Sequence, residues 1–352
     1  MQTPEYDVAV VGAGPAGASA AISASRLGAR VLLMDYKKSP GLPVQCAEYV
    51  PLSVRQYTDL PPGAVVQKIN TLLTYINNEL VSTLSGPGYI LDRGIFDRSL
   101  VEAAVAAGAE FMAGAKAAAR SEDAITVSRA GKGSRSIKCK VIIGADGPRS
   151  TVGRWMGSVN RDFMIALQYK LPLRRQQTST DVYFSPEYIG GYGWVFPKGA
   201  YANVGVGVSF SYKDRLQECV QSFVNRLIRR EILSDGHPLM KTSGLIPVGG
   251  PLPVTKRENM LLAGDAAGHT HPVTGGGIMN AVVTGRMAGE TAARAALSGQ
   301  LEYLSQYPPQ WQSQLGRFLH KAVQQRHDMD QHWTEDAPQF EALIKRTWIG
   351  CD

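Results

Sequence analysis

The sequence predicts an α/β protein of two lobes, in which a discontinuous α/β unit is joined to a smaller antiparallel sheet and followed by helices. Three observations support this fold class. A strand, turn, helix and strand pattern opens the chain, strand-like segments fill residues 166–208, and a buried strand of the first type returns near residue 259. The length of 352 residues and the hydrophobic content of 44% suit two or three lobes better than one.

The opening segment is a glycine-rich turn that follows the apolar run at residues 8–11. The turn reads Gly12-Ala13-Gly14-Pro15-Ala16-Gly17. Gly12 allows a tight strand-to-helix turn, Gly14 lets the backbone approach a pyrophosphate, and Gly17 lets the next helix pack closely on its strand. The free N–H groups and positive dipole end of that helix would face the phosphates. This order of elements predicts a Rossmann-like dinucleotide-binding unit.

A second parallel strand is expected at residues 31–34, and it ends at Asp35. The Asp35 carboxylate can accept two hydrogen bonds from the hydroxyls of an adenosine ribose. The same carboxylate repels a 2′-phosphate, so the site suits FAD or NAD better than NADP.

Composition excludes several classes of protein. The longest apolar stretches fall short of the ~18 residues of a spanning helix, and the first strand begins too early for a signal peptide, so we expect a cytoplasmic protein. Lysine and arginine exceed the acidic residues by 37 − 30 = 7, which favours anionic membranes or acidic partners. Because the basic residues form no aromatic-interleaved stripe, no nucleic acid is expected.

The cysteines and histidines do not indicate a metal site. The four cysteines lie at positions 46, 139, 219 and 351, without any close pair, which argues against zinc and disulfides. Five of the six histidines fall at or after His269, but the spacing of His327 and His332 is poor for one helical face. We therefore expect no metal and reduced thiols.

The first half of the chain alternates between the two lobes. Residues 39–48 are expected to form a proline-rich extended loop. Residues 65–84 are expected to form a hairpin around Asn77-Asn78, which ends at residues 86–88. Residues 93–104 are expected to form a helix. A third parallel strand is expected at residues 108–111 and a hairpin at 115–140. The buried strand 140–147 ends in an acidic turn, and a short helix starts at Ser150.

The second half completes both lobes. Strands fill residues 166–208, and an amphipathic helix at 214–233 covers their sheet. A strand at 259–267 leads through Gly275-Gly276-Gly277 into a helix from Ile278 to about residue 297. Residues 1–64, 89–160 and 253–300 are thus assigned to the nucleotide unit, 65–88 and 161–252 to the antiparallel sheet, and 301–352 to a C-terminal helical segment.

Four elements together resemble the set that marks FAD-dependent enzymes of the p-hydroxybenzoate hydroxylase type. They are residues 12–35, the stretch 91–97 with Arg93, the segment 144–147 with Asp146, and the run from Gly264 to Gly277. The resemblance implies FAD as the cofactor.

Further motifs resemble the geranylgeranyl reductase family over roughly residues 5 to 300. They are residues 43–48, 166–169, 191–199, 203–205 and 271–278, and the Tyr-x-Trp-x-Phe-Pro element at 192–197 is the most distinctive. The implied activity is reduction of C=C bonds in an isoprenoid or other apolar substrate.

The resemblance also assigns residues to the flavin. The helix that starts at Ile278 would stabilise negative charge at the N1/O2 edge of the isoalloxazine, and Asp265 would bind the ribityl chain or a phosphate. The remaining assignments to the cofactor site are Gly12, Gly14, Pro15, Ala16, Gly17, Asp35, Cys46, Ala47, Arg93, Ala117, Asp146, Gly264, Gly275, Gly276 and Gly277.

The substrate side rests on two features. Tyr192, Trp194 and Phe196 alternate along one strand, so their side chains share one face of the sheet. This face can belong to the hydrophobic core, or it can form, with Pro197, the wall of a substrate cavity over the flavin. Cys46 suits either a small apolar position or a catalytic role in positioning the ring or delivering a proton. Glu48 is a weaker candidate acid.

Three functions stay open at this point. The leading one is hydride transfer from reduced flavin N5 to an isoprenoid C=C bond. The alternative is a monooxygenase or dehydrogenase acting on an aromatic group, including a tryptophan of a partner protein during quinone-cofactor biosynthesis; the third is a non-enzymatic flavin module. The electron donor is not identified, because only one nucleotide fingerprint is present, and a peripheral membrane contact is left open.

Overall fold

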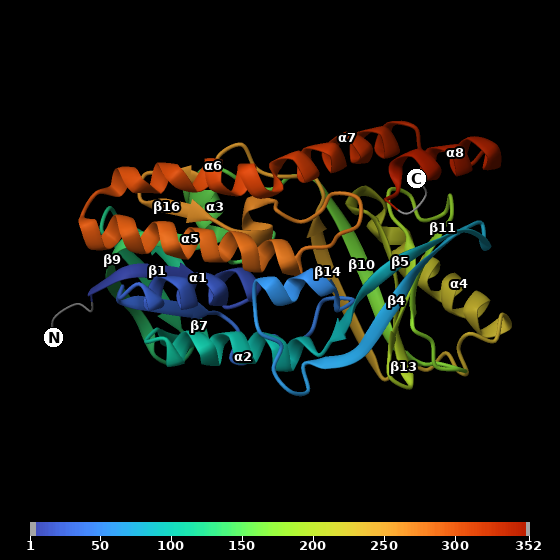
Figure 1. Ribbon diagram of the computed structural model, residues 1–352, viewed down its shortest axis with the longest axis horizontal. Coiled ribbons are helices and arrows are strands. Elements are labelled where there is room, and N and C mark those ends of the chain that lie inside the picture. Colours follow the sequence, from blue (N-terminus) through green and yellow to red (C-terminus); the bar gives the residue numbers. More distant parts are fainter. Residues whose placement is uncertain (1–4, 350–352) are drawn as a thin grey trace.

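The computed structural model describes residues 5–349, so Cys351 and the end of the C-terminal segment lie outside the described residues. Two lobes lie side by side along the longest axis, and the C-terminal helices run across the top of both (Figure 1). One lobe is the α/β unit with β1, α1 and α5; the other is built around the second sheet. The two-lobed α/β fold is confirmed.

The first sheet has the strand order β15-β16-β9-β1-β2-β6, with β7 and β8 attached to β9. The pairs β1–β2, β1–β9, β2–β6 and β9–β16 are parallel. Its strands are β1 (Glu5–Val11), β2 (Val31–Asp35), β6 (Glu110–Ala113), β7 (Ala115–Arg120), β8 (Ala124–Arg129), β9 (Gly133–Gly144), β15 (Lys256–Arg257) and β16 (Met260–Leu262). The five parallel strands follow the 3-2-1-4-5 order of a Rossmann unit.

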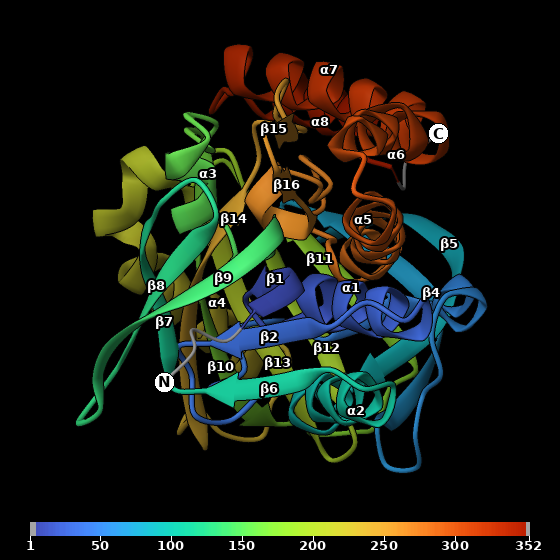
Figure 2. The ribbon, with the colours of Figure 1, turned by 90° about the vertical axis from the view of Figure 1, so that its left-hand side faces the viewer.

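Helices cover one face of this sheet, and the β7–β8 meander covers the other (Figure 2). The covering helices are α1 (Pro15–Arg26), α2 (Arg93–Ala106) and α5 (Ile278–Ser298). α1 and α5 touch through glycines: a Cβ on Gly285 would lie 2.1 Å from the Ala16 carbonyl oxygen, and one on Gly289 would lie 2.1 Å from that of Ala20. The carbonyl end of β1 therefore carries two closely packed helix starts.

The second sheet has the order β14-β10-β13-β12-β11-β4-β5-β3. Its strands are β3 (Tyr49–Pro51), β4 (Val65–Ile76), β5 (Glu79–Leu91), β10 (Phe163–Pro172), β11 (Ser179–Phe184), β12 (Gly193–Lys198), β13 (Tyr201–Ser209) and β14 (Met240–Pro247). α4 (Leu216–Arg229) packs on one face through Val220, Phe223 and Leu227, as the amphipathic pattern predicts.

Three expectations about these strands are wrong in detail. Residues 86–88 do not end the hairpin: β5 continues to Leu91 because Gly88 pairs with Pro51 of β3. The second sheet is not purely antiparallel, since β4 and β11 pair in parallel. The segment 115–140 forms three strands instead of one hairpin, because the chain turns a first time at residues 121–123.

Short-range signals at the element ends are confirmed. Asn77 and Asn78 have φ of 50° and 71° at the tip of the β4–β5 hairpin, as two-residue hairpin turns require. The helices expected from Arg93 and Ser150 are present as α2 and α3 (Thr151–Trp155). Asp92, for which no cap was predicted, accepts a hydrogen bond from the Ile95 N–H (3.0 Å), and Ser150 caps α3.

The C-terminal segment is helical, as expected. It contains the turns η4 (Leu301–Gln306) and η5 (Gln312–Gly316) and the helices α6 (Tyr307–Trp311), α7 (Arg317–Gln331) and α8 (Ala337–Thr347). Shorter turns elsewhere are η1 (Leu52–Gln56), η2 (Phe210–Arg215) and η3 (Gly264–Ala267). Among residues 5–349, the helices are all too short or too polar to cross a bilayer.

Candidate functional site

The three glycines of the opening turn have different structural roles. Gly12 has a φ of +99°, and a Cβ there would lie 2.3 Å from the Ala145 carbonyl oxygen. A Cβ on Gly17 would lie 1.8 Å from the Gly12 carbonyl oxygen. Around Gly14 no atom lies within 4 Å of such a Cβ, so this backbone is open to a ligand. Gly12 and Gly17 close the turn, and Gly14 leaves room above it.

The start of α1 presents free N–H groups beside an acid. Gly14 is the N-cap and offers no side-chain acceptor, and Pro15 occupies the first helical position. Asp35 lies alongside: its Oδ2 accepts from the Ala13 N–H (2.7 Å) and its Oδ1 from the Lys37 N–H (2.8 Å). The carboxylate is thereby fixed next to the glycine turn, as expected for a dinucleotide site.

The turn η3 closes this cradle from the second-half segment. Gly264 has a φ of +62°, and a Cβ there would lie 2.8 Å from the Ala16 Cβ. Asp265 follows, and its Oδ1 accepts from the Thr270 hydroxyl (2.7 Å). Burial raises the pKa of the Asp265 carboxyl, and the positive charge of Arg93 partly opposes this. Residues separated by some 250 positions therefore meet at the glycine turn.

α5 begins within reach of Asp265. Its N-cap Gly277 supplies no side-chain acceptor, and a Cβ there would lie 3.2 Å from Asp265 Oδ1. Gly275 has a φ of +66°, and the Gly276 N–H donates to the Thr274 hydroxyl (3.2 Å). A 21-residue helix thus aims its free N–H groups at the region of Asp265. This is the arrangement expected for the anionic edge of a reduced flavin.

Arg93 connects the cofactor side to the Cys46 loop (residues 39–48). Its guanidinium forms a two-point ion pair with Asp97, at 2.7 and 2.8 Å. The Cys46 thiol lies beside the same guanidinium and accepts from the Glu48 N–H (3.2 Å). Burial raises the pKa of the Cys46 thiol, and Arg93 lowers it by less. Cys46 therefore holds its proton at neutral pH.

Side chains of the second sheet hold the Cys46 loop from below. Gln168 Nε2 donates to the Cys46 carbonyl (3.0 Å), and Asn203 Nδ2 donates to the Ala47 carbonyl (3.2 Å) and to Glu48 Oε2 (2.9 Å). The sequence analysis assigned no role to Gln168 or Asn203, although both lie in motifs of the family resemblance. The feature that could have identified them is a polar residue inside an otherwise apolar strand.

Glu48 is a structural anchor in this arrangement. It is 2% exposed, has a φ of 72°, and pairs with Lys198 Nζ at 2.6 Å. Its Oε1 accepts from the Arg93 N–H (2.9 Å). Since every donor around Glu48 comes from a different element, one carboxylate joins the Cys46 loop, α2 and the second sheet.

The aromatic row lies on the face of the second sheet opposite α4. Tyr192 and Trp194 are 8% and 6% exposed, and their rings are 6.0 Å apart. Trp194 Nε1 donates to Gln168 Oε1 (2.9 Å), and the Tyr192 hydroxyl donates to the Thr274 carbonyl just before α5. Gly205 makes room for the indole, because a Cβ there would lie 2.3 Å from Trp194. The row therefore contacts both the Cys46 loop and the start of α5.

The edge of the row is more open. Phe196 is half-buried and meets the Tyr49 ring edge-on at 6.2 Å. Pro197 pairs with Ala202, whose side chain belongs to the core under α4, so strand alternation directs Pro197 away from the aromatic face. The C-terminal helices cover the other end, where Trp348 lies 5.3 Å from Tyr192.

Two predicted cofactor residues have structural partners of their own. The Asp146 carboxylate accepts from the Ser150 hydroxyl and from the Thr151 N–H (2.6 Å), so it caps the turn before α3. Ala117 is 3% exposed and packs in the core of the first sheet. Asn160 links the Pro148 carbonyl (3.1 Å) to that of Asp265 (2.9 Å), which ties the Asp146 turn to the cradle.

Two buried histidines lie in the loop between η3 and α5. His269 is fully buried, its two ring nitrogens have no hydrogen-bond partner among residues 5–349, and its ring lies 4.6 Å from Trp311. His271 is 4% exposed and accepts from the Thr274 N–H (3.2 Å). Burial lowers the pKa of His269 to about 3 and that of His271 to about 4. Among residues 5–349, no group of three or more potential metal ligands forms.

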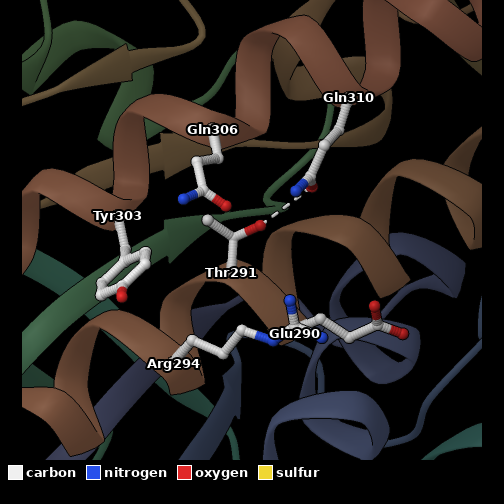
Figure 3. A pocket seen from close by; sticks show the side chains of 6 residues that line it. All are labelled: Glu290, Thr291, Arg294, Tyr303, Gln306 and Gln310. Carbon is white, nitrogen blue, oxygen red and sulfur yellow. Dashed lines mark hydrogen bonds between the residues drawn. The ribbon is translucent and has the colours of Figure 1, made fainter.

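A small cavity between α5 and the η4–α6 segment lies apart from these residues (Figure 3). Its volume of about 10 Å³ is close to the size of one water molecule. The Thr291 hydroxyl bonds to Gln310 Oε1 (3.1 Å) across it. Its lining residues are Glu290, Thr291, Arg294, Tyr303, Gln306 and Gln310. We interpret it as a packing defect.

The strand order, the glycine cradle and the two helix starts define a dinucleotide-binding protein. Residues 7–147 match the family model of FAD dependent oxidoreductases. Residues 162–244, which include the aromatic row and Gln168, match the geranylgeranyl reductase catalytic domain.

Similarity to characterised sequences extends over most of the chain. It is 34% identical to digeranylgeranylglycerophospholipid reductase 2 of Methanopyrus kandleri, covering 91% of this chain and 85% of that protein. It is 31% identical to the reductase of the same name from Methanococcus vannielii, covering 89% and 84%. The chain belongs to the geranylgeranyl reductase family of FAD-dependent oxidoreductases.

Solved structures share the fold. A geranylgeranyl bacteriochlorophyll reductase-like protein from Thermoplasma acidophilum superposes with a TM-score of 0.87 at 24% identity, over 99% of this chain and 97% of that one. A probable FAD-dependent monooxygenase from Pseudomonas aeruginosa reaches 0.69 at 18% identity, over 97% and 99%. The fold therefore serves reductases and oxygenases alike, and the activity of this chain has to be argued from its site.

Proposed function

We propose that this protein reduces isolated C=C bonds in the polyprenyl chains of a lipid. One observation carries the proposal: the aromatic row contacts the Cys46 loop through Gln168 and the start of α5 through Thr274. An apolar surface, a protonated thiol and the helix start expected at the flavin are thereby joined. The reductases named above act on digeranylgeranylglycerophospholipid, which suits this combination.

The cofactor would be held by backbone more than by side chains. The turn at Gly12–Gly17 would hold the pyrophosphate and Asp35 the ribose, while Asp265 and the α5 start would face the ribityl chain and the ring. When bound and reduced, FAD supplies a hydride to one alkene carbon. The chain has to position the alkene, exclude water and deliver a proton to the other carbon.

Cys46 is the proposed proton donor. Its thiol is protonated at neutral pH because burial raises its pKa, and the Glu48 N–H and Arg93 fix its position. The Arg93 guanidinium lowers the pKa of the thiol, but by less than burial raises it. Oxidation of the thiol or its replacement by serine is expected to slow proton delivery without removing FAD.

Tyr192, Trp194 and Phe196 are proposed to position the substrate chain, and strand alternation leaves Pro197 out of this wall. Each CH₂ group buried against such a surface contributes about 0.8 kcal/mol, so a long polyprenyl chain binds tightly without polar contacts. A lipid substrate also implies contact with a membrane surface.

The test is anaerobic incubation of the chemically reduced holoenzyme with geranylgeranyl lipids in detergent. We expect a mass gain of two hydrogens for each double bond reduced. Cys46→Ser should lower the rate about 10²-fold or more while FAD absorbance is retained, as expected for loss of a general acid. No mass gain, together with oxygen-dependent hydroxylation of an aromatic group in a small molecule or a partner protein, would establish the oxygenase alternative.

A further inference from the structure

Five exposed basic side chains belong to α3 and its neighbours in sequence, to η2 and to β15; α3 lies at the upper left of Figure 2. One precedes α3, one lies within it, one follows it, one belongs to η2 and one to β15. We name them the basic patch: Arg149, Arg154, Arg161, Lys213 and Arg257.

Contacts connect four members of the basic patch, and Arg161 follows Asn160, whose Nδ2 donates to the Pro148 carbonyl (3.1 Å). Arg149 and Lys213 both lie over the Phe210 ring, at 5.9 and 5.2 Å from its centroid. Arg154 donates to the Arg149 carbonyl (3.0 Å), and a Cβ on Gly157 would lie 3.3 Å from the Arg257 guanidinium. The patch therefore joins the Asp146 turn of the nucleotide unit to the start of α4.

The charges of the basic patch are not neutralised by residues 5–349. In the described part of the chain, none of the five forms an ion pair with a carboxylate. The exposed acids Asp162 and Asp214 adjoin Arg161 and Lys213 in sequence but do not pair with them. By contrast, Arg93, Arg226 and Arg326 each bind a carboxylate. An anionic partner from outside would find these five cations free.

Apolar side chains project among these cations. Val159 is 39% exposed and Tyr212 is 42% exposed, and they belong to the segments that carry Arg161 and Lys213. Cations interspersed with an aromatic ring and an aliphatic side chain are typical of surfaces that lie at the headgroup level of a bilayer. An acidic protein partner would require the cations but not these apolar side chains.

A surface hollow of about 490 Å³ adjoins the patch and shares Tyr212 with it. The opposite wall is the α7–α8 connection, where Trp333 donates to the Pro186 carbonyl (3.0 Å). The Trp333 ring meets Phe340 at 5.2 Å, and Phe340 packs in the same cluster as Tyr192 and Trp194. The hollow is therefore separated from the aromatic row by a layer of apolar side chains.

We propose that the basic patch, with Val159 and Tyr212, docks this protein on the surface of an anionic lipid bilayer. The inference rests on the proposed function, because a polyprenyl lipid resides in the bilayer. Docking in this orientation turns the hollow at Tyr212 and Trp333 toward the lipid, next to the apolar layer that covers the aromatic row. The negatively charged headgroups supply the missing partners of the five cations.

The test is co-sedimentation of the FAD-loaded protein with vesicles. Binding is expected to vesicles containing phosphatidylglycerol, not to pure phosphatidylcholine, and should weaken between 0.05 and 0.5 M salt because the charges are exposed. Arg161→Glu with Lys213→Glu should weaken binding about 30-fold or more, since each cation lost at a charged surface costs about fivefold. Tyr212→Ser should weaken it less and leave the salt dependence intact.

A matched control carries the same change in charge elsewhere. Lys68→Glu with Lys132→Glu replaces two exposed lysines that lie on β4 and on the β8–β9 turn, and it should lower vesicle binding only slightly. Equal losses in both double variants, or no binding of the wild type, would overturn the docking face. Capture of a soluble acidic protein that is lost with Arg161 and Lys213 but not with Tyr212 would also overturn it.

The proposed reductase function and the proposed docking face can be disproved independently of each other. Reduction of detergent-solubilised lipid should be unchanged in Arg161→Glu/Lys213→Glu, because neither side chain contacts the cradle or the aromatic row. Loss of vesicle binding with retained reduction of solubilised lipid supports the docking face. No reduction of solubilised lipid by the wild type would overturn the proposed function, whatever the vesicles show.

Discussion

The cofactor cradle and the Cys46 loop are built on opposite principles. Around Gly12 and Gly17 the close contacts are with backbone atoms and around Gly264 with the Ala16 methyl group, so a Cβ at any of the three would clash. The Cys46 loop is instead held by polar side chains from distant strands, mainly Gln168 and Asn203. A backbone cradle can be recognised from a short sequence, whereas a side-chain frame exists only once both sheets are assembled.

The stability of the cofactor cradle should depend on pH more strongly than that of the Cys46 loop, and this difference is the largest effect expected. His269 and His271, on the cofactor side, are neutral when folded but protonate near pH 6.5 when unfolded. Since the unfolded state binds more protons at these two side chains, they lower the stability by about 6 kcal/mol as the pH drops from 6.5 toward 4. Asp181, whose pKa burial raises to about 6, offsets part of this loss. Chemical denaturation at pH 7, 5.5 and 4.5 measures this loss.

His269→Phe keeps a ring against Trp311 and should remove about half of this pH dependence. The exposed His320→Phe is the control and should leave the dependence unchanged. If His269→Phe gave the wild-type pH profile, acid would be acting first on the ion pairs near Cys46, and the contrast between the two regions would be wrong.

The second effect concerns the side-chain frame. Glu48→Ala removes the partner of Lys198 and of two further donors in a buried position. Of the carboxylates in residues 5–349, Lys198 would keep only that of Asp92, 3.9 Å away. An unpaired buried charge costs about 3–5 kcal/mol, which is the upper bound for this loss of stability, and the melting temperature should drop. Lys198→Met with Glu48→Gln should recover part of the loss, because no charge is then left unpaired.

The third effect separates the glycines of the cradle. Gly17→Ala forces a methyl group against the Gly12 carbonyl and should cost about 1–3 kcal/mol or more, even without cofactor. Gly14→Ala meets no protein atom and should leave the stability of the apoprotein unchanged while weakening FAD binding about tenfold or more. Equal stability of the two apoproteins would show that Gly17 is not the point of close approach.

The smallest effect tests the link between the aromatic row and the Cys46 loop. Trp194→Phe removes the hydrogen bond to Gln168 but keeps an aromatic ring. The expected loss of stability is about 1 kcal/mol, since one buried hydrogen bond is removed. KM for the lipid should rise more than kcat falls; an unchanged KM would mean that Trp194 belongs to the core alone.

The sequence was sufficient for the nucleotide unit because its signals are local. The turn at Gly12–Gly17, Asp35, the hairpin tip at Asn77-Asn78 and the cap at Ser150 depend on neighbouring residues, and the strands formed around them as expected. The parallel pairing of β4 with β11 has no such signal, because nothing local distinguishes it from an antiparallel partner.

The candidate site, like the fold, was predictable only where its signals are local. The residues that belong to recognisable sequence motifs were identified, and their contacts with the cofactor stay predictions. The anchors Gln168, Lys198 and Asn203 were not given roles, because they act on Cys46, Ala47 and Glu48 across more than 100 positions of sequence. A polar side chain in a buried strand was their only signal, and it does not specify a partner.

The interlocking of α1 with α5 has a consequence for how the protein is made. Gly285 and Gly289 pack directly on the backbone of Ala16 and Ala20, so the N-terminal helix lacks its closest neighbour until nearly 290 residues have been synthesised. Translation at about 5–20 residues per second leaves the nascent nucleotide unit incomplete for many seconds. Loading of FAD is therefore expected to be a late event, after most of the chain has left the ribosome.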